Sequence, residues 1–350
     1  MKHNIKVTAI LIAMFVITQL IGLFVIYVYN NENNVLPYGM QPPPEIQNSE
    51  ENMCSSLPTY TQVFSCLFKD FSWTLVFSFI IAIAVLMFLT RFKFDNFLKL
   101  WFFAVIILAL GLSLKALVLF KFKDIIIINK IPILSVLIPE LSLFSFGIFL
   151  LISLPLAYIK IFKRNILVHN ITELLVYPGI AAVLVPVLNV FGIVLFLLLI
   201  SLYDIWAVWH SQFMQNMAKY QINTLRIFTG FFIPYADAKE KLKIENIKEK
   251  FKNKSEKFLD EKFKKAKIKV HLAILGGGDI VFPIITAGVF YKIYHSFIPP
   301  LIIMFFATLA LLYLFVFAQK GKFYPAMPFL SIGMYIGMIL TWILMALNII

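Results

Sequence analysis

The sequence predicts an all-α, polytopic membrane protein, with residues 1–350 forming a single membrane domain of nine transmembrane helices. The composition is the first reason, because 61% hydrophobic and 14% charged residues leave too little polar surface for a water-soluble globule. The length of the apolar runs is the second. Lipid cannot hydrogen-bond to backbone groups, so a spanning segment must be a helix or part of a closed barrel, and long unbroken runs favour helices.

Nine apolar runs provide the roughly 20 residues that a helix needs to cross a bilayer core of about 30 Å. The first run follows Lys2 and Lys6, exceeds an ordinary signal-peptide core and precedes no small-residue cleavage site, so we expect a retained helix. The apolar stretch 125–139 is shorter and contains two prolines, and we interpret it as an interfacial segment or as the approach to the fourth helix. The nine runs are residues 7–29, 71–89, 101–120, 141–159, 166–188, 190–209, 270–293, 298–317 and 325–350.

The distribution of Lys and Arg predicts the orientation, because positively charged connections stay on the cytoplasmic side. With the N-terminus inside, the cytoplasmic connections hold most of the basic residues, including Lys160 and those of the long connection 219–269. We therefore expect a cytoplasmic N-terminus and an extracytosolic C-terminus. A tenth span at 125–139 would place the basic connection outside, which is a further argument for nine. The opposite side holds only Lys69, Lys121, Lys123, Lys130 and Lys292.

The same distribution argues against nucleic acid as a partner and for the lipid bilayer as the surroundings. The net charge of +13 comes from residues between apolar runs, without the interleaved aromatic side chains of a base-stacking surface. Cys54 and Cys66 are the only cysteines and lack metal-ligand spacing. We expect two free thiols, although an extracytosolic loop would also permit a disulfide. His210 and His271 lack further ligands, so we expect no metal and no cofactor.

Four acidic residues lie in or beside predicted spans, where an ionisable side chain costs at least about 2.5–3.5 kcal/mol. Glu140 lies beside Pro139 at the edge of one span and Glu173 in the first turns of the next, so both can reach an interface or a partner. Asp204 and Asp279 lie deeper. At 1.5 Å per helical residue, they are roughly 8 Å and roughly 13 Å from the cytoplasmic ends of their spans. Two antiparallel helices would therefore bring these carboxylates to a similar level.

Two carboxylates that face each other in a low-dielectric site share one proton and titrate as a pair. The ionised member can deprotonate a water while the protonated member polarises a carbonyl, which is acid–base catalysis of amide hydrolysis. The backbone before Asp279 favours such a site, because Gly276, Gly277 and Gly278 allow close approach of another backbone. Pro283 also removes the helical hydrogen bond to the Asp279 carbonyl, so we expect a loosened helix there.

A third motif, formed by Pro325, Ala326, Met327 and Pro328, begins the ninth span. Its two prolines prevent regular helical hydrogen bonding and leave backbone groups available near the level of the two aspartates. A proline at a helix start is common, so this motif alone is weak evidence for a functional site and counts only together with the other two motifs.

Together, the Tyr203–Asp204 pair, the GGGD run ending at Asp279 and the PAMP run at 325–328 resemble the presenilin and signal-peptide-peptidase family of GxGD-type intramembrane aspartyl proteases. The resemblance covers the chain from about residue 189 onward, and the first five helices match in number and hydrophobicity. It implies a scaffold in 1–188 and a catalytic half in 189–350.

The resemblance also implies roles for single residues. Asp204 and Asp279 would be the catalytic pair, supported by Tyr203 and the three glycines, and the PAMP run would align the site and contact the substrate. The substrates would be transmembrane helices of other proteins. Two positions depart from the family pattern. Gly277 stands where presenilins usually have leucine, which would alter substrate preference or add flexibility, whereas Met327 replaces a leucine with similar volume.

Within the family, the charge bias and the segment YDIWAV are nearer to presenilins. The Lys- and Ile-rich composition is typical of an archaeal member, which we expect to act as a single chain without partner subunits. Two alternatives remain. An ion leak channel or transporter would also use intramembrane carboxylates, but it has no evident need for all three motifs. Cleavage of type II helices in the manner of signal peptide peptidase would be favoured by the inverted topology.

The residues just before the seventh span alternate between polar and apolar, which is typical of a half-buried strand. We predict an edge strand, to which an unwound substrate could add by β-augmentation close to Asp279. The alternative is a basic juxtamembrane anchor that leads directly into the helix. The segment comprises Lys267, Ile268, Lys269, Val270, His271 and Leu272.

Overall fold

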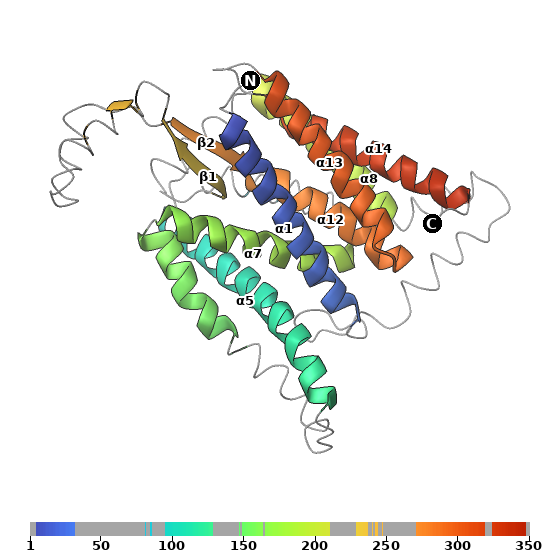
Figure 1. The fold of residues 1–350 in the computed structure, drawn as a ribbon, viewed down its shortest axis with the longest axis horizontal. Coiled ribbons are helices and arrows are strands. Elements are labelled where there is room, and N and C mark those ends of the chain that lie inside the picture. Colours follow the sequence, from blue (N-terminus) through green and yellow to red (C-terminus); the bar gives the residue numbers. More distant parts are fainter. Residues whose placement is uncertain are drawn as a thin grey trace.

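A computed structural model of the chain describes residues 5–31, 95–128, 149–163, 165–210, 229–236, 271–318 and 324–347, with a few isolated positions (Figure 1). Several sequence-based predictions lie outside these residues. They are the second span apart from two positions, the cysteines, Glu140, the greater part of the connection 219–269, and Lys267–Val270 of the predicted strand.

Helices make up almost all of the described chain. The first half contains α1 (Ile5–Asn31), α5 (Asp95–Ile128), a helix over 149–158 that continues as the π-helix η1 (Ile159–Lys163), α7 (Ile166–Leu184) and the short η2 (Val185–Val187). The second half contains α8 (Val190–Ile205), the π-helix η3 (Trp206–His210), α12 (Gly277–Tyr294), α13 (Ile298–Phe317) and α14 (Met327–Ala346). Two strands, β1 (Gly230–Tyr235) and β2 (His271–Gly276), lie between α8 and α12 in sequence.

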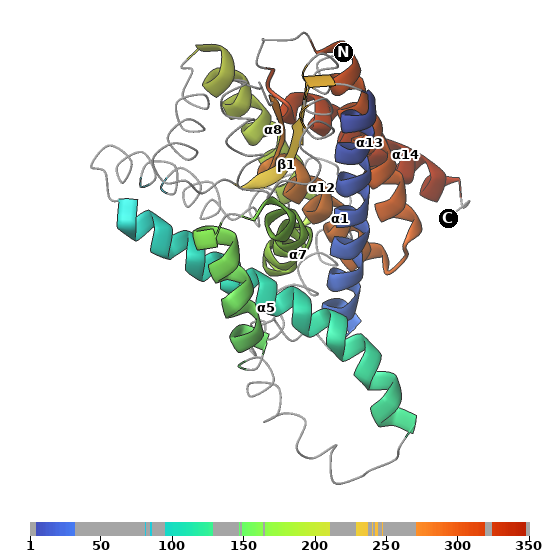
Figure 2. The same cartoon turned by 60° about the vertical axis from the view of Figure 1, so that its left-hand side comes forward.

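Six of the described helices are long and apolar enough to cross a membrane, which identifies an integral, multi-pass protein. They correspond in order to the first, third, fifth, sixth, eighth and ninth predicted spans. The total of nine stays a prediction. One of the six, α5, is 34 residues long and so measures about 51 Å. It includes residues 125–128, the start of the stretch that the sequence suggested to be interfacial, and it lies oblique to α1 (Figure 2).

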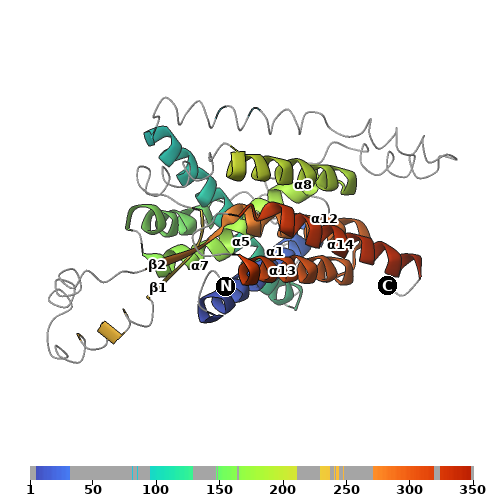
Figure 3. The same ribbon diagram turned by 90° about the horizontal axis from the view of Figure 1, so that it is seen from above.

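The helix α12 occupies the middle of the bundle. It packs against α1, α7, α8, α13 and α14, and most of its residues are buried (Figures 1 and 2). A helix that is apolar on all sides is expected in such a position, because no face needs water. Its surroundings therefore consist of neighbouring helices, and its first turn lies where the strands meet the bundle (Figure 3).

The predicted seventh span, 270–293, is wrong at its beginning. Residues His271–Gly276 form a strand, and the helix starts at Gly277. Hydropathy alone could not show this, since a short apolar run of four to eight residues suits a strand and a buried helix equally. The strand pairs antiparallel with β1, from Gly230 opposite Gly276 to Tyr235 opposite His271. The segment of β1 was not predicted to be a strand.

Two glycines of α14 allow a close contact between α13 and α14. A Cβ atom at Gly333 would lie 2.7 Å from both the Phe306 carbonyl oxygen and the Ala310 Cβ. One turn later, a Cβ at Gly337 would lie 2.9 Å from the Ile303 Cα. Pairs of small residues four apart allow such approach between helices in lipid, where dispersion contacts rather than the hydrophobic effect drive association.

We predict that Gly333→Ala lowers the free energy of unfolding by about 1–3 kcal/mol, because the added methyl group meets backbone that cannot move aside cheaply. Thermal unfolding of the purified protein in detergent measures the change. Gly147→Ala is the matched control, since nothing lies within 4 Å of a Cβ atom at Gly147. Equal stability of the two variants would show that α13 and α14 are not held at this contact.

Candidate functional site

Asp204 lies at the C-terminal end of α8, and only 5% of its surface is exposed. Directly after it, the chain changes from α-helix to the π-helix η3, and the Trp206 N–H bonds to the carbonyls of both Leu202 and Tyr203. Such π-helical turns are frequent at functional sites. The neighbouring Tyr203 is half-buried and packs near Trp206, with ring centroids 6.4 Å apart.

The PAMP run meets Asp204 directly. The Met327 N–H donates a hydrogen bond of 3.0 Å to Oδ2 of Asp204, and the Ala326 N–H also interacts with this carboxylate. Pro325 and Pro328 have no N–H, so Ala326 and Met327 supply the run's only backbone donors. These donors belong to the N-terminus of α14, where unsatisfied N–H groups and the helix dipole favour an anion.

Two further hydrogen bonds hold α8 against α14. The Ser201 hydroxyl lies 2.7 Å from the Ser331 hydroxyl, one turn before Asp204 and one turn after Met327. The Tyr335 hydroxyl donates to the Val194 carbonyl at 2.8 Å. Polar contacts between helices are not exchanged for water in an apolar bundle, so they fix the relative position of the two helices.

Asp279 lies in the first turn of α12, with Gly276 as the N-cap. The sequence-based estimate of the depth of Asp279 assumed a helix from residue 270. It does not hold, because His271–Gly276 form a strand. A Cβ atom at Gly276 would lie 3.2 Å from Oδ2 of Asp279, so the carboxylate folds back over this glycine. Pro283 follows one turn later, inside α12.

The other two glycines differ from each other. A Cβ atom at Gly277 would lie 2.8 Å from the hydroxyl oxygen and from Cε1 of Tyr177, a buried side chain of α7. At Gly278 the nearest atom, Cε2 of Phe282, is 3.8 Å away, which is ordinary contact. The glycine in place of the leucine usual in presenilins therefore matches a tyrosine that fills the space, a packing reason that the sequence alone did not suggest.

The fold brings the two aspartates together. They come from α8 and α12, which are in contact, and the carboxylates are close enough for their charges to interact. Three of the motifs singled out in the sequence thus meet at one place, where α8, α12 and α14 contact one another in pairs.

The strand β2 leads into this place, since Gly276 ends the strand and precedes α12. Of the six residues predicted to form a strand, His271 and Leu272 lie in β2. The described strand continues further toward Asp279 than predicted. The Gly277 N–H donates to the Thr229 carbonyl at 3.2 Å, which extends the pairing with the β1 segment into the first residue of α12.

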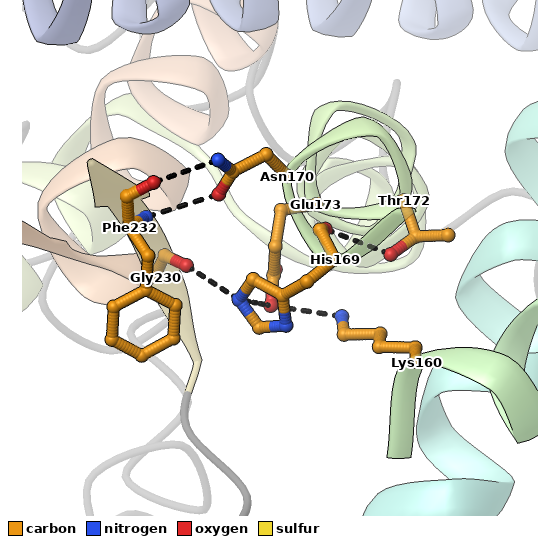
Figure 4. A network of polar contacts seen from close by, with 7 residues as sticks. All are labelled: Lys160, His169, Asn170, Thr172, Glu173, Gly230 and Phe232. Atoms are coloured by element: carbon orange, nitrogen blue, oxygen red, sulfur yellow. Dashed lines mark hydrogen bonds and ion pairs between the residues drawn. The ribbon is translucent and has the colours of Figure 1, made fainter. Parts of the chain in front are cut away.

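A buried polar cluster beside the sheet was missed by the sequence reasoning (Figure 4). Nζ of Lys160 in η1 lies 2.8 Å from Oε1 of Glu173 in α7, and the two side chains are 2% and 0% exposed. His169 Nε2 lies 3.5 Å from the same oxygen. Glu173 has therefore reached a partner, one of the two outcomes expected. Lys160, interpreted as a topology charge, points inward from a π-helix.

The comparisons with known proteins agree with this arrangement. The family "Signal-peptide peptidase, presenilin aspartyl protease" matches residues 71–347, which is most of the chain. The protein belongs to this family. The resemblance inferred from the three motifs is thereby confirmed, and family and fold together indicate an intramembrane aspartyl protease of the presenilin and signal-peptide-peptidase type.

A solved structure, described as that of "a presenilin family intramembrane aspartate protease", is similar in fold to this family member. The TM-score is 0.50, with 95% of this chain and 97% of that chain covered and 14% of residues identical. At this identity the likeness concerns the fold. A comparison with curated proteins found no match.

We predict that Glu173→Leu destabilises the protein by about 3–5 kcal/mol, because it leaves the Lys160 ammonium buried without its partner. The double variant Lys160→Met with Glu173→Leu removes both charges and recovers most of this loss. Thermal unfolding of the three proteins measures both steps. A double variant that is as unstable as the single one would show that lost packing, rather than the unpaired charge, is the cause.

Proposed function

We propose that the protein is an intramembrane endopeptidase that hydrolyses peptide bonds within transmembrane helices of other membrane proteins, with Asp204 and Asp279 as the catalytic pair. One observation supports the proposal above others. Two carboxylates, brought by the contact of α8 with α12, interact in a site surrounded by apolar helices. A charged group in such surroundings is costly, so two at one place need a function.

The proposed reaction follows from the chemistry of two carboxyl groups that share a proton. One carboxylate takes a proton from water, and the water oxygen attacks the carbonyl carbon of the scissile peptide. The other carboxyl donates its proton to the carbonyl oxygen, which gives a tetrahedral diol. Return of a proton to the amide nitrogen then breaks the C–N bond. The Met327 N–H holds Oδ2 of Asp204 in place.

The sheet offers a place for the substrate backbone, which must unwind before a dyad can reach it. Phe232 of β1 stands opposite Ile274 of β2, and both backbone groups of Phe232 bond away from β2, to Asn170 of α7. In an antiparallel pair of strands, two residues that face each other without bonding to each other both direct their backbone groups outward. The N–H and carbonyl of Ile274 therefore point away from β1. Within the described residues the sheet has two strands, so the outer groups of Ile274 can receive an extended substrate.

We place the N-terminus in the cytoplasm and the C-terminus outside. Lys160 is buried in an ion pair and no longer counts as a topology charge. The remaining basic residues keep the asymmetry, since the connection 219–269 carries half of them. In this orientation, which is that of presenilins, a single chain cleaves the substrates without partner subunits.

We predict that Asp204→Asn and Asp279→Asn each reduce turnover to below about 1% of wild type, because acid–base participation is typically worth 100-fold or more. Purified protein is incubated with a fluorescent transmembrane peptide, with and without an aspartyl-protease transition-state isostere. Unchanged thermal unfolding shows that the variants are folded. Residual turnover of a tenth of wild type in either variant would reject the dyad.

A second prediction concerns the strand edge. Ile274→Pro removes an outward N–H of β2 without touching the hydrogen bonds to β1. Loss of one backbone hydrogen bond, worth about 0.5–1.5 kcal/mol, lowers kcat/KM by roughly 2- to 12-fold. The isostere, held at the carboxylates, should bind as before.

Ile274→Val is the matched control, since valine favours strands and keeps the N–H. Equal kcat/KM of the proline and valine variants would show that the substrate does not pair with this edge of β2.

A further inference from the structure

The outer edge of β1 is closed by side chains of α7. The Asn170 amide makes two hydrogen bonds to Phe232: its Nδ2 donates to the carbonyl oxygen at 2.8 Å, and its Oδ1 accepts from the N–H at 3.0 Å (Figure 4). The Gly230 carbonyl lies 2.8 Å from His169 Nε2. A carbonyl only accepts, so Nε2 carries the proton.

These contacts reproduce what a neighbouring strand would provide. A strand beside β1 would exchange one N–H and one carbonyl bond with Phe232 and would donate to the carbonyl two residues earlier. Asn170 and His169 supply the same donors and acceptor from a helix. Pro234 follows on the same edge, where its missing N–H costs nothing. Of the outward groups of β1, the Gly230 carbonyl and both groups of Phe232 are thus occupied, and Pro234 has no donor.

We propose that Asn170 and His169 are positioning residues that block substrate addition to β1, so that an unwound substrate can pair only with β2 beside Asp279. The inference rests on the proposed protease function and names two residues that restrict where its substrate binds. Exposed edges accept extended chains indiscriminately, and proteins commonly cover the edge that must not pair.

Strand spacing explains why the choice of edge matters. A substrate on β2 lies about 4.8 Å from the strand that continues into Asp279, whereas a substrate on β1 lies about 9.6 Å from it, on the opposite side. The second position keeps the scissile bond away from the carboxylates. A substrate bound there would occupy the protein without being cleaved, or would be cleaved in a different register.

The buried cluster holds the blocking residues in place. His169, Glu173 and Tyr177 follow one another at four-residue spacing on one face of α7. Glu173, paired with Lys160, lies against His169, and the Phe232 ring lies tilted against the imidazole with centroids 5.0 Å apart. Tyr177, one turn further, packs under Gly277. The same face of α7 therefore positions both β1 and the first turn of α12.

Asn170→Ala tests the proposal against Asn165→Ala. Asn165 is the N-cap of α7 and accepts from the Leu167 and Val168 N–H groups, so its loss weakens the same helix without touching β1. For both variants we measure the cleavage of the fluorescent transmembrane peptide that the isostere inhibits. The ends of the products are identified by mass spectrometry. Binding of the isostere is measured separately.

We expect Asn170→Ala to lower kcat by roughly 10- to 100-fold, because part of the substrate then pairs with β1 and a misplacement of even about 1 Å can cost about 100-fold. We also expect products cut at new positions. Isostere affinity should stay within about two-fold, since Asp204 and Met327 are untouched. Asn165→Ala should cleave at the wild-type positions with wild-type kcat. A merely structural role of Asn170 would lower stability without moving the cleavage sites.

His169 provides a second test if Asn170→Ala does not fold. His169→Phe keeps the aromatic ring beside Phe232 but loses the donor to Gly230, whereas His169→Gln keeps a donor amide. The phenylalanine variant should show the altered products and the glutamine variant the wild-type ones. Wild-type products from Asn170→Ala, or from His169→Phe, would overturn the proposal. Cleavage that persists in Asp204→Asn would instead reject the aspartate pair, and a wild-type protein that cleaves no peptide would overturn the protease function itself.

Discussion

The contact between Gly277 and the Tyr177 ring determines where the strand β2 ends and the helix α12 begins. Only a glycine permits α12 to start so close to α7. The preceding residues then run along β1, and the following turn presents Asp279 toward α8. If α12 began one residue earlier or later, the carboxylate would rotate by about 100° around the helix, as 3.6 residues per turn requires. The position of Asp279 thus depends on a side chain about a hundred residues away in sequence.

A second constraint is that polar groups inside an apolar bundle need partners. Asp204 is held by the first N–H groups of α14, Glu173 by Lys160, and the outer edge of β1 by Asn170. The first and third of these contacts join elements far apart in the chain, and the second joins two consecutive helices. Breaking one leaves a group that water cannot easily reach, so the same contacts that stabilise the fold also specify its geometry.

The site therefore draws on both halves of the sequence. Residues of α8, α12 and α14 surround the carboxylates, but α7 supports the first turn of α12 and covers β1. Burying the charges of Lys160 and Glu173 costs free energy, which their close pairing must offset. Their pairing orients His169, and His169 holds the Gly230 carbonyl.

Sequence alone indicated a mostly helical membrane protein, six of the described spans and the family, and it singled out the two aspartates as candidates, because hydropathy and short motifs are local signals. It also indicated a strand before α12 from a six-residue alternation. Tertiary structure decided that β1 pairs with β2, that Lys160 turns inward to Glu173, and that Tyr177 fills the space at Gly277. These features arise from contacts between separate elements of the chain. The pairing of two apolar strands produces no periodic pattern within one segment of the sequence, and neither does a buried ion pair. Only the folded chain therefore reveals these features.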